Sequence, residues 1–305
     1  MTKITEVTPL ELKGETKKPT LIAARPVITV REALKTLATH NITSLPIYSH
    51  SSNKIVNIVN LVDILNYIVK EAVADEKHPI AMNSAKANNL DNTIESVMTL
   101  DVDRESYRIF VSDAHEGLKK TLEAFSRGTH RSLVIDYTEK TPPYILTQTD
   151  IVRYVHNHPE SVPGIGFDAS LQSLGLGLRD YKVVSGHVSE SALNVYRRMA
   201  EKDLSGIPIL DSENRLVLSL SVSDLRGLNY QSIDNLILPV QEFLETLPNN
   251  GKSLHPITAT RQSTLREVLD LIVENHIHRI WIVDESQKIL DVVSLSDIIE
   301  SFAKL

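Results

Sequence analysis

The feature that most constrains the fold of this chain is a sequence pattern that recurs four times. Each copy contains an amphipathic segment, two short apolar runs separated by polar turn residues, and an aspartate that opens a further apolar segment. The aspartates lie in the stretches NLVDIL, TQTDIV, SVSDLR and SLSDII, and they are Asp63, Asp150, Asp224 and Asp297. A pattern that returns four times in the same order predicts four copies of one structural unit.

Each unit is predicted to fold as strand, helix, strand, strand and helix. In amphipathic segments such as VREALKTLATHNI and STLREVLDLIVENH, apolar residues recur at three- and four-residue spacing, as the buried face of a helix requires. The two apolar runs that follow are separated by turn residues, which is typical of a β-hairpin. The predicted fold class is therefore α/β (α+β). Because a three-stranded unit buries one face of its sheet only against a neighbour, we expect the four units to pack in pairs.

Turn-rich stretches between the copies set the predicted boundaries. They give an N-terminal segment 1–19, repeat one 20–73, repeat two 93–157, a linker 158–175, repeat three 176–230 and repeat four 248–305. The linker is rich in Pro and Gly and lies at the middle of the chain. We therefore expect the chain to divide there, with repeats one and two forming one pair and repeats three and four the other.

Composition narrows the class of protein. The formal net charge of −7 argues against a general nucleic-acid binder, because such proteins carry a basic surface. The absence of cysteine excludes disulfides and thiolate metal sites, and it fits a reducing compartment. No apolar run reaches the roughly 18 residues of a membrane span, and the N-terminal stretch shows no secretory signal. We expect a soluble cytoplasmic protein, with the nucleus as an alternative location and with neither nucleic acid nor membrane as a partner.

The recurring aspartate has two interpretations. It follows Asn60, Thr147, Ser221 or Ser294 by three residues, where a predicted strand meets a predicted helix. Such residues cap backbone N–H groups at the start of a helix. Alternatively, the carboxylate faces a cleft and accepts hydrogen bonds from ribose hydroxyls, while a Ser or Thr hydroxyl and the helix N-terminus bind a phosphate. Because a cap tolerates Ser, Thr or Asn in place of Asp, four aspartates favour the ligand-binding interpretation.

A second recurring position lies at the start of the middle strand, and we refer to it as the dipeptide position. Repeats two and four carry His130-Arg131 and His278-Arg279 there, whereas repeats one and three carry Thr43-Ser44 and Ser205-Gly206. A guanidinium binds phosphate through two parallel hydrogen bonds, and a histidine adds a donor. A surface ion pair or a core histidine is the alternative for either dipeptide alone. With the chain divided at its middle, each expected pair contains one His-Arg and one neutral dipeptide.

These motifs resemble those of the cystathionine-β-synthase (CBS) domain family, whose units have this element order and end in Ser/Thr-x-x-Asp. Four units in one chain, paired as two Bateman modules in a flat disc, are similar to the gamma subunit of AMP-activated protein kinase and its fungal counterpart. The resemblance implies regulatory binding of AMP, ADP or ATP, energy sensing, and kinase catalytic or scaffold subunits as partners. It assigns Asp63, Asp150, Asp224 and Asp297 to the ribose, and His130, Arg131, His278, Arg279, Thr147, Ser221 and Ser294 to the phosphates.

The sequence also departs from the kinase subunits. Thr43 stands where they typically carry a basic residue, Asn60 replaces a hydroxyl residue, and all four aspartates are present although those subunits usually lose one. The chain equally resembles stand-alone four-repeat CBS proteins of fungi and plants, some of which are assigned to phosphatase inhibition or stress signalling. An interaction protein with weak or no nucleotide binding, and a phosphatase as partner, is therefore the alternative.

Other signals carry little weight. His156 and His158 with Glu160 suggest a metal site, but they lie in a Pro-rich connection with no second cluster of metal ligands. The GIG and GLG stretches lack the third glycine of a dinucleotide-binding loop. No nucleophile or base is positioned beside the dipeptide position. We therefore expect no catalytic residue, no metal and no cofactor apart from regulatory nucleotides.

Overall fold

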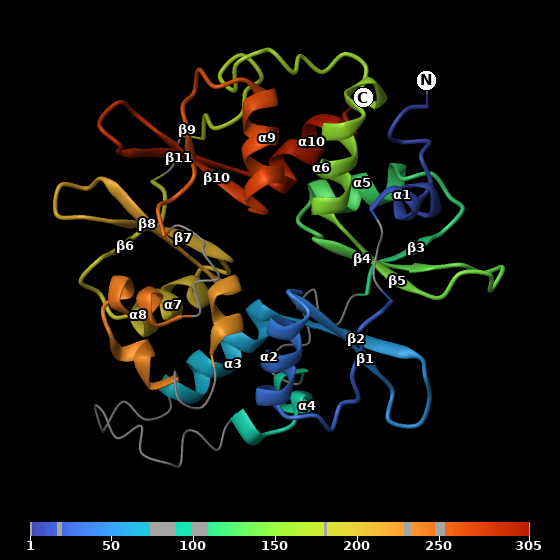
Figure 1. The fold of residues 1–305 in the computed structure, drawn as a ribbon, viewed down its shortest axis with the longest axis horizontal. Helices are drawn as coiled ribbons and strands as arrows, with labels where there is room; N and C mark the ends of the chain where they lie inside the picture. Colours follow the sequence, from blue (N-terminus) through green and yellow to red (C-terminus); the bar gives the residue numbers. More distant parts are fainter. Residues whose placement is uncertain are drawn as a thin grey trace. The chain divides into compact units, whose positions relative to one another are not determined.

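Each of the four repeats is built around a β-hairpin (Figure 1). The computed structural model describes residues 2–16, 20–73, 90–98, 109–179, 182–228, 233–247 and 254–304. The predicted ranges also contain residues 1, 17–19, 99–108, 180–181, 229–230, 248–253 and 305, which lie outside the described residues.

The first half of the chain contains repeats one and two. Repeat one consists of α2 (Val30–Thr39), β1 (Ser44–Tyr48), β2 (Ile55–Asn60) and α3 (Leu61–Val73). Repeat two consists of β3 (Val111–Asp113), α5 (Lys119–Ser126), β4 (Arg131–Ile135), β5 (Tyr144–Thr147) and α6 (Gln148–Asn157). The short helix α4 (Ile94–Met98) lies within the range predicted for repeat two, but it packs against α2 and α3.

The second half contains repeats three and four. Repeat three consists of β6 (Gly186–His187), α7 (Ala192–Glu201), β7 (Gly206–Leu210), β8 (Leu216–Ser221) and the 3₁₀ helix η4 (Val222–Gly227), and it is followed by η5 (Ile233–Ile237) and α8 (Val240–Thr246). Repeat four consists of β9 (Thr258–Ala259), α9 (Leu265–Asn275), β10 (Arg279–Val283), β11 (Ile289–Ser294) and α10 (Leu295–Ala303).

The strand order agrees with the prediction in repeats two, three and four. In each, the first strand pairs in parallel with the middle strand, and the last strand pairs with the middle strand antiparallel. Repeat one has a single parallel bridge between Ala24 and Ile47 where the first strand is expected. The last element of repeat three also differs, because η4 is a six-residue 3₁₀ helix that ends at Gly227, a residue type that favours helix termination.

Local capping explains where α2 and α9 begin. Thr29 precedes α2, and its hydroxyl accepts a hydrogen bond from the Glu32 N–H while the Glu32 carboxylate accepts one from the Thr29 N–H. Thr264 and Glu267 form the same capping box at α9.

Within the described residues, no helix is both long and apolar enough to cross a membrane.

The repeats pack pairwise, but not with the partners that we predicted. One compact unit contains residues 1–21, 110–183 and 257–305, and we call it the 2/4 unit because it combines repeats two and four. The other contains residues 22–109 and 184–256, and we call it the 1/3 unit. The predicted division at the middle of the chain is therefore wrong for these units. The physical reason is that the apolar faces of the helices pack between alternate repeats.

The core of the 1/3 unit joins helices of repeats one and three. Helix α3 packs against α7, and both α2 and α3 pack against η4. Tyr196 of α7 is buried and meets Phe243 of α8 edge to face, with ring centroids 6.0 Å apart. The Tyr196 hydroxyl donates a hydrogen bond to the Ser221 carbonyl oxygen at 3.2 Å, so the one polar atom of this ring has an acceptor.

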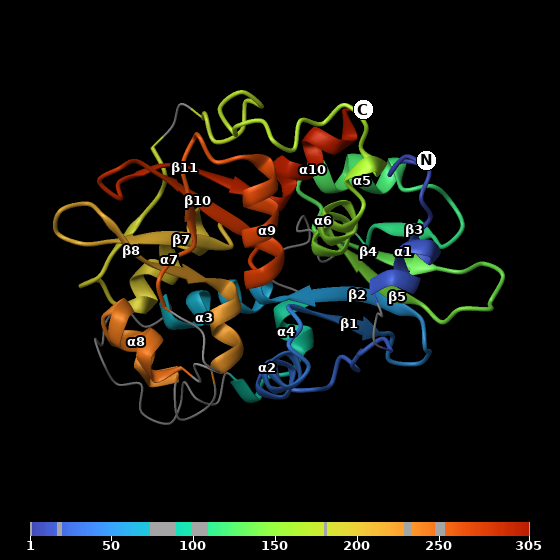
Figure 2. The ribbon, with the colours of Figure 1, turned by 45° about the horizontal axis from the view of Figure 1, so that its top comes forward.

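The core of the 2/4 unit joins helices of repeats two and four. Helix α10 packs against α5 and α6, and α6 also packs against α9, as both views of the ribbon show (Figures 1 and 2). Phe125 of α5 and Phe302 of α10 are fully buried there. Repeat two also buries a trio of hydroxyl groups, in which the Ser112 Oγ lies 2.8 Å from the Thr121 Oγ1 and 2.6 Å from the Ser132 Oγ.

The N-terminal segment belongs to the 2/4 unit. Its helix α1 (Pro9–Thr16) packs against α6, and Ile4, Val7 and Leu12 are buried. The Leu118 N–H donates a hydrogen bond to the Val7 carbonyl oxygen at 2.9 Å, which ties the segment to the start of α5. This mixed-charge stretch therefore contributes apolar side chains to the core, a role that its polar composition did not indicate.

The segment predicted as a linker also packs into the 2/4 unit. Phe167 and Leu171 are buried, and the Leu171 N–H donates to the Ser263 carbonyl oxygen at 2.9 Å. The Leu265 N–H donates to the Ala169 carbonyl oxygen at 3.1 Å. The linker thus runs along the start of α9 in repeat four, which places it inside a unit rather than between two units.

Candidate functional site

Strand pairing brings the two recurring motifs of each repeat together. The residue that ends the hairpin lies opposite the second residue of the dipeptide position, in the pairs Ser44–Asn60, Arg131–Thr147, Gly206–Ser221 and Arg279–Ser294. A further backbone hydrogen bond holds each junction, as in Gln148 N–H to His130 O and Leu295 N–H to His278 O, both at 3.1 Å. The dipeptide position and the Ser/Thr-x-x-Asp motif therefore lie side by side at one end of every hairpin.

All four aspartates lie in the first turn of a helix and help to cap its start. The Oδ2 atoms of Asp63, Asp150, Asp224 and Asp297 accept hydrogen bonds at 2.7 to 2.8 Å from the N–H groups of the residues three positions earlier. In repeats two, three and four the hydroxyl of that earlier residue also donates to the same oxygen, at 2.6 to 3.1 Å. The capping interpretation is thus observed. The contact with a ribose stays a prediction, and it remains compatible with capping because a carboxylate has further acceptor positions.

Burial separates the acidic and basic groups of the site. Asp63 and Asp150 are 6% and 3% exposed, and Asp224 and Asp297 are half-buried. The basic dipeptides are more accessible, because His130 and His278 are exposed and Arg131 and Arg279 are half-buried. In repeat two, a ligand at this end of the hairpin thus meets the buried Asp150 carboxylate beside the more accessible His130 and Arg131.

Both His-Arg dipeptides belong to the 2/4 unit, which corrects the expectation of one in each pair. The two helix N-termini that follow them are joined by Gln148, the first residue of α6. Its side-chain amide donates to the Ser296 hydroxyl at the start of α10 at 2.8 Å and to the Phe125 carbonyl oxygen at 2.9 Å. Two helix N-termini and two guanidinium groups in one unit favour the binding of an anion.

The 1/3 unit has neutral dipeptides but contains an arginine that the sequence analysis missed. The Arg226 guanidinium in η4 donates to the Asn41 side-chain oxygen in repeat one, and its Nε donates to the Ser223 carbonyl oxygen at 3.1 Å. Burial lowers the pKa of Arg226, and attraction to Asp224 opposes that shift. The only signal in the sequence is an arginine two residues after the aspartate of repeat three.

A second arginine outside the repeat pattern contacts a predicted site residue directly. Arg179 follows the linker, and its guanidinium donates to the Oδ1 atom of Asp297. It also donates to the Val292 carbonyl oxygen at 3.2 Å, and its backbone N–H donates to the Asp291 Oδ2 atom at 2.7 Å. Sequence reasoning had no means of finding this contact, because Arg179 and Asp297 are far apart in the chain and Arg179 has no counterpart in the repeat pattern.

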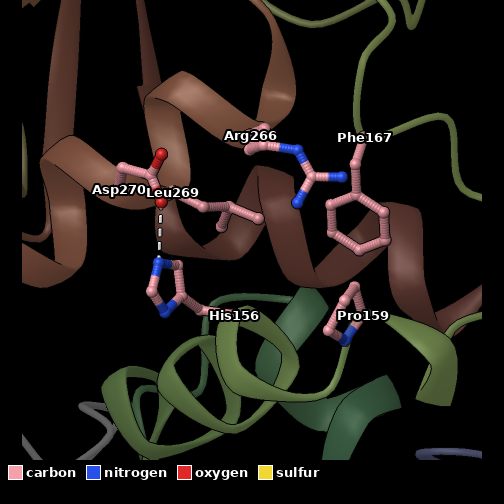
Figure 3. Close-up of a pocket in the computed structure, with 6 residues that line it drawn as sticks. All are labelled: His156, Pro159, Phe167, Arg266, Leu269 and Asp270. Carbon is pink, nitrogen blue, oxygen red and sulfur yellow. Dashed lines mark hydrogen bonds and ion pairs between the residues drawn. The ribbon is translucent and has the colours of Figure 1, made fainter.

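A small pocket lies between α6 and α9 in the 2/4 unit, away from these motifs (Figure 3). His156 points toward Asp270, with 2.7 Å between Nε2 and Oδ1, and Arg266 lies against the Phe167 ring at 5.6 Å from its centroid. The volume is about 70 Å³, whereas ligand pockets usually have about 300–1,000 Å³. The pocket is therefore too small for a nucleotide.

The histidines considered for metal binding are engaged with carboxylates instead. The His158 Nε2 atom lies 2.8 Å from a Glu15 oxygen, and its Nδ1 atom lies 3.3 Å from a Glu160 oxygen. Over the residues that the structure describes, no group of three or more His, Cys, Asp or Glu side chains is arranged to hold a metal ion.

Comparison with known protein families agrees with the repeat pattern. The family model described as "CBS domain" matches residues 16–70, 178–228 and 252–304, which together make up more than half of the chain. These matches lie in repeats one, three and four. Repeat two has the same order of elements and the same register, although it carries the buried hydroxyl trio in its core.

Curated relatives fall into two groups by name. The chain is 24% identical over 296 residues to Protein SDS23 of Eremothecium gossypii, covering 90% of this chain and 59% of the relative. It is 23% identical over 321 residues to the SNF1-related protein kinase regulatory subunit gamma-like PV42a of Arabidopsis thaliana, covering 90% and 88%. It is 25% identical over 287 residues to the 5'-AMP-activated protein kinase subunit gamma of Dictyostelium discoideum, covering 89% and 47%. The chain thus spans less than two thirds of the SDS23 and Dictyostelium relatives.

Solved structures share the fold. Protein MJ1225 from Methanocaldococcus jannaschii has a TM-score of 0.71 at 18% identity, covering 93% of this chain and 96% of that one. A conserved protein from Pyrococcus horikoshii has a TM-score of 0.54 at 17% identity, with the same coverage. The predicted fold class is confirmed, and the family-model matches carry the assignment: the chain belongs to the CBS domain family.

Proposed function

We propose that this chain is a regulatory protein of the kinase gamma-subunit type that binds AMP, ADP or ATP and thereby changes how a partner protein is held. The observation that carries the proposal is the arrangement of the 2/4 unit, where Arg131 lies opposite Thr147 and Arg279 lies opposite Ser294. Each pair adjoins a capped helix N-terminus, and the two termini are joined through Gln148. The gamma subunits among the named relatives support the same proposal.

The chemistry of each group fits one part of a nucleotide. Arg131 and Arg279 bind the phosphates, since a planar guanidinium forms two parallel hydrogen bonds with an oxyanion. His130 and His278 add donors, and the Thr147 and Ser294 hydroxyls lie beside them. Asp150 and Asp297 accept hydrogen bonds from the ribose hydroxyls. In the 1/3 unit, Asp63, Asp224 and Ser221 have the same places but adjoin neutral dipeptides, so we expect weaker binding of phosphate there.

Regulation requires that the nucleotide distinguish two states of the protein. A ligand shifts an equilibrium only by the difference between its affinities for the two states. AMP and ATP carry different numbers of phosphate groups, so a cluster of cations gives them different affinities. We expect the chain itself to perform no reaction, and we expect it to act in the cytoplasm, with the nucleus as an alternative.

Calorimetric titration with AMP, ADP and ATP tests the binding step. Replacing Arg131 or Arg279 with Gln should weaken AMP binding about tenfold to a hundredfold, because a hydrogen bond to a charged group contributes roughly 1.5–3 kcal/mol. Arg215→Gln is the matched control, since Arg215 pairs with Asp211 and Glu213 on an exposed turn. Adenosine should bind the wild-type chain and both variants alike, because it has no phosphate. The Arg179 guanidinium occupies one oxygen of Asp297, so the titration includes a variant that lacks Arg179. If neither the wild-type chain nor this variant binds a nucleotide, the proposal is excluded.

The similarity to Protein SDS23 supports a second candidate function. In this candidate, the chain is a stand-alone interaction protein, such as a regulator of a phosphatase or of a stress pathway, and nucleotides bind weakly or not at all. Affinity purification of the tagged chain from its own cells distinguishes the two. Recovery of kinase catalytic or scaffold subunits supports the gamma-subunit proposal, whereas recovery of a phosphatase without a kinase supports the alternative.

A further inference from the structure

The segment 176–179 is fixed on the sheet of repeat four. Leu176 is buried, and Gly177 has a φ of +67°, a conformation that favours glycine. A Cβ at Gly177 would lie 3.1 Å from a carbon of Ile282 and 3.4 Å from a carbon of Val293, so the backbone approaches the hairpin closely. This approach delivers the next residues, including Arg179, to the end of β11 where the Ser/Thr-x-x-Asp motif begins.

Arg179 contacts repeat four through both its backbone and its side chain. Its backbone N–H donates to the buried carboxylate of Asp291, and its guanidinium donates to the Val292 carbonyl oxygen and to Asp297. The Arg179 side chain is 37% exposed, and the Asp297 side chain is 17% exposed. The guanidinium is therefore partly in contact with solvent, whereas the Asp297 carboxylate is less accessible.

Both oxygens of Asp297 are engaged in this arrangement. The Oδ2 atom accepts from the N–H and the hydroxyl of Ser294 at 2.8 and 2.7 Å, and the Oδ1 atom accepts from Arg179. A ribose that binds through its two hydroxyls needs acceptor positions on the same carboxylate. Removing Arg179 from Oδ1 makes such positions available without breaking the helix cap.

We propose that Arg179 is a latch that closes the repeat-four site by occupying Asp297, and that a nucleotide binds there only by displacing the Arg179 guanidinium. This inference rests on the proposed function and adds the regulation of one of its sites. Salt screens an ion pair that is partly exposed, so it weakens the contact between Arg179 and Asp297. Nucleotide affinity at repeat four should therefore depend on the salt concentration.

The test compares Arg179→Gln with the wild-type chain by calorimetric titration with AMP and with adenosine. The variant should bind both ligands about two- to fivefold more tightly, because neither has to break the ion pair. Arg179→Lys, which keeps the charge without the planar fork, should give an intermediate affinity. Arg215→Gln should leave affinity unchanged, and thermal unfolding of each variant checks that it is folded.

A second pair of variants shows whether the effect passes through the carboxylate. In an Asp297→Asn background, Arg179→Gln should no longer change affinity, because the ion pair is already lost. An equal gain in that background would overturn the latch, as would unchanged or weaker binding by Arg179→Gln alone. Weaker binding would show instead that Arg179 contacts the phosphate. If the wild-type chain fails to bind and Arg179→Gln binds, the latch is supported, whereas failure of both excludes the latch and the proposed function together.

Discussion

Two glycines near the N-terminal segment respond in opposite ways to the same substitution. Gly14 is exposed within α1, and a Cβ added there would have no neighbouring atom within 4 Å. Gly14→Ala should therefore stabilise the protein by about 0.5–1 kcal/mol through the helix propensity of alanine. A Cβ at Gly117 would lie 2.6 Å from the Thr5 carbonyl oxygen, so Gly117→Ala should cost about 1–3 kcal/mol. Urea unfolding measures both, and equal effects would contradict the close approach of the segment.

His158 gives the N-terminal segment a dependence on pH. Partial burial disfavours the charged ring, but hydrogen bonds to Glu15 and Glu160 outweigh that effect and raise the His158 pKa above its ordinary value of 6.5. A raised pKa in the folded state stabilises the protein at low pH, and this contribution is lost as the pH rises through the folded-state pKa.

His158→Gln should accordingly lower the free energy of unfolding, relative to the wild-type chain, by more at about pH 6 than at about pH 8.5. Urea unfolding at both pH values measures it. His50→Gln is the control, since His50 is exposed and pairs with Glu95 in the 1/3 unit. A difference that grows with pH would show that the ion pairs of His158 do not act as described.

At the residue scale, the sequence draws attention to residues that recur and gives no signal for residues that occur once. The aspartates recur in four repeats and the His-Arg dipeptide in two, and their contact with a nucleotide stays a prediction. Arg179 and Arg226 each occur once and reach their partners only through packing between segments far apart in the chain. Spacing along the sequence carries no information about such contacts.

At the scale of single elements, α1 is the one whose contribution is most easily tested. Leu12 is fully buried against the 2/4 core, so Leu12→Ala should lower the free energy of unfolding by about 2–5 kcal/mol. Val27 is 62% exposed, and Val27→Ala is the control with little expected effect. Urea unfolding monitored by circular dichroism measures both variants. A cost at Leu12 below about 0.5 kcal/mol would place it in the range of surface substitutions.

Elements with strong local signals were predicted, and those that depend on their surroundings were not. Helices α2 and α9 combine an apolar face with a capping box, so their pattern and their start signals agree. Helix α1 has no such face, and only its neighbours make Leu12 a core residue. The Pro and Gly content of residues 158–175 predicted a linker, but composition does not show that the Leu171 N–H donates to the Ser263 carbonyl oxygen of repeat four.

For the whole molecule, the sharing of each core between alternate repeats predicts the behaviour of the separated halves. Residues 1–157 contain the repeat-one part of one core and the repeat-two part of the other, and residues 158–305 contain the remaining parts. Either half alone leaves apolar helix faces uncovered, so each should aggregate or self-associate. Co-expressed halves should form a one-to-one complex, which size-exclusion chromatography with light scattering detects. A stable monomer of either half would contradict the observed division of the cores.

The number and order of the repeats could be predicted for the whole molecule, but their partners could not. Repetition of the pattern fixes how many units to expect, and the hairpin places Arg279 beside Ser294 by local pairing alone. Which repeat covers the helices of another depends on the shapes of two apolar faces, and the sequence pattern does not describe those shapes. The turn-rich linker suggested a boundary between two pairs of repeats, but each compact unit contains residues from both sides of it.

The alternate sharing of cores also sets the order in which a ribosome can complete them. Helix α3 of repeat one ends at Val73, and its partner α7 begins at Ala192, more than a hundred residues later. At synthesis rates of about 5–20 residues per second, the apolar face of α3 stays uncovered on the order of ten seconds before its partner is synthesised. Helix α5 waits longer still, until α10 at the end of repeat four emerges. We therefore expect the nascent chain to expose two incomplete cores at once. Chaperones that bind apolar helices are suited to protect them.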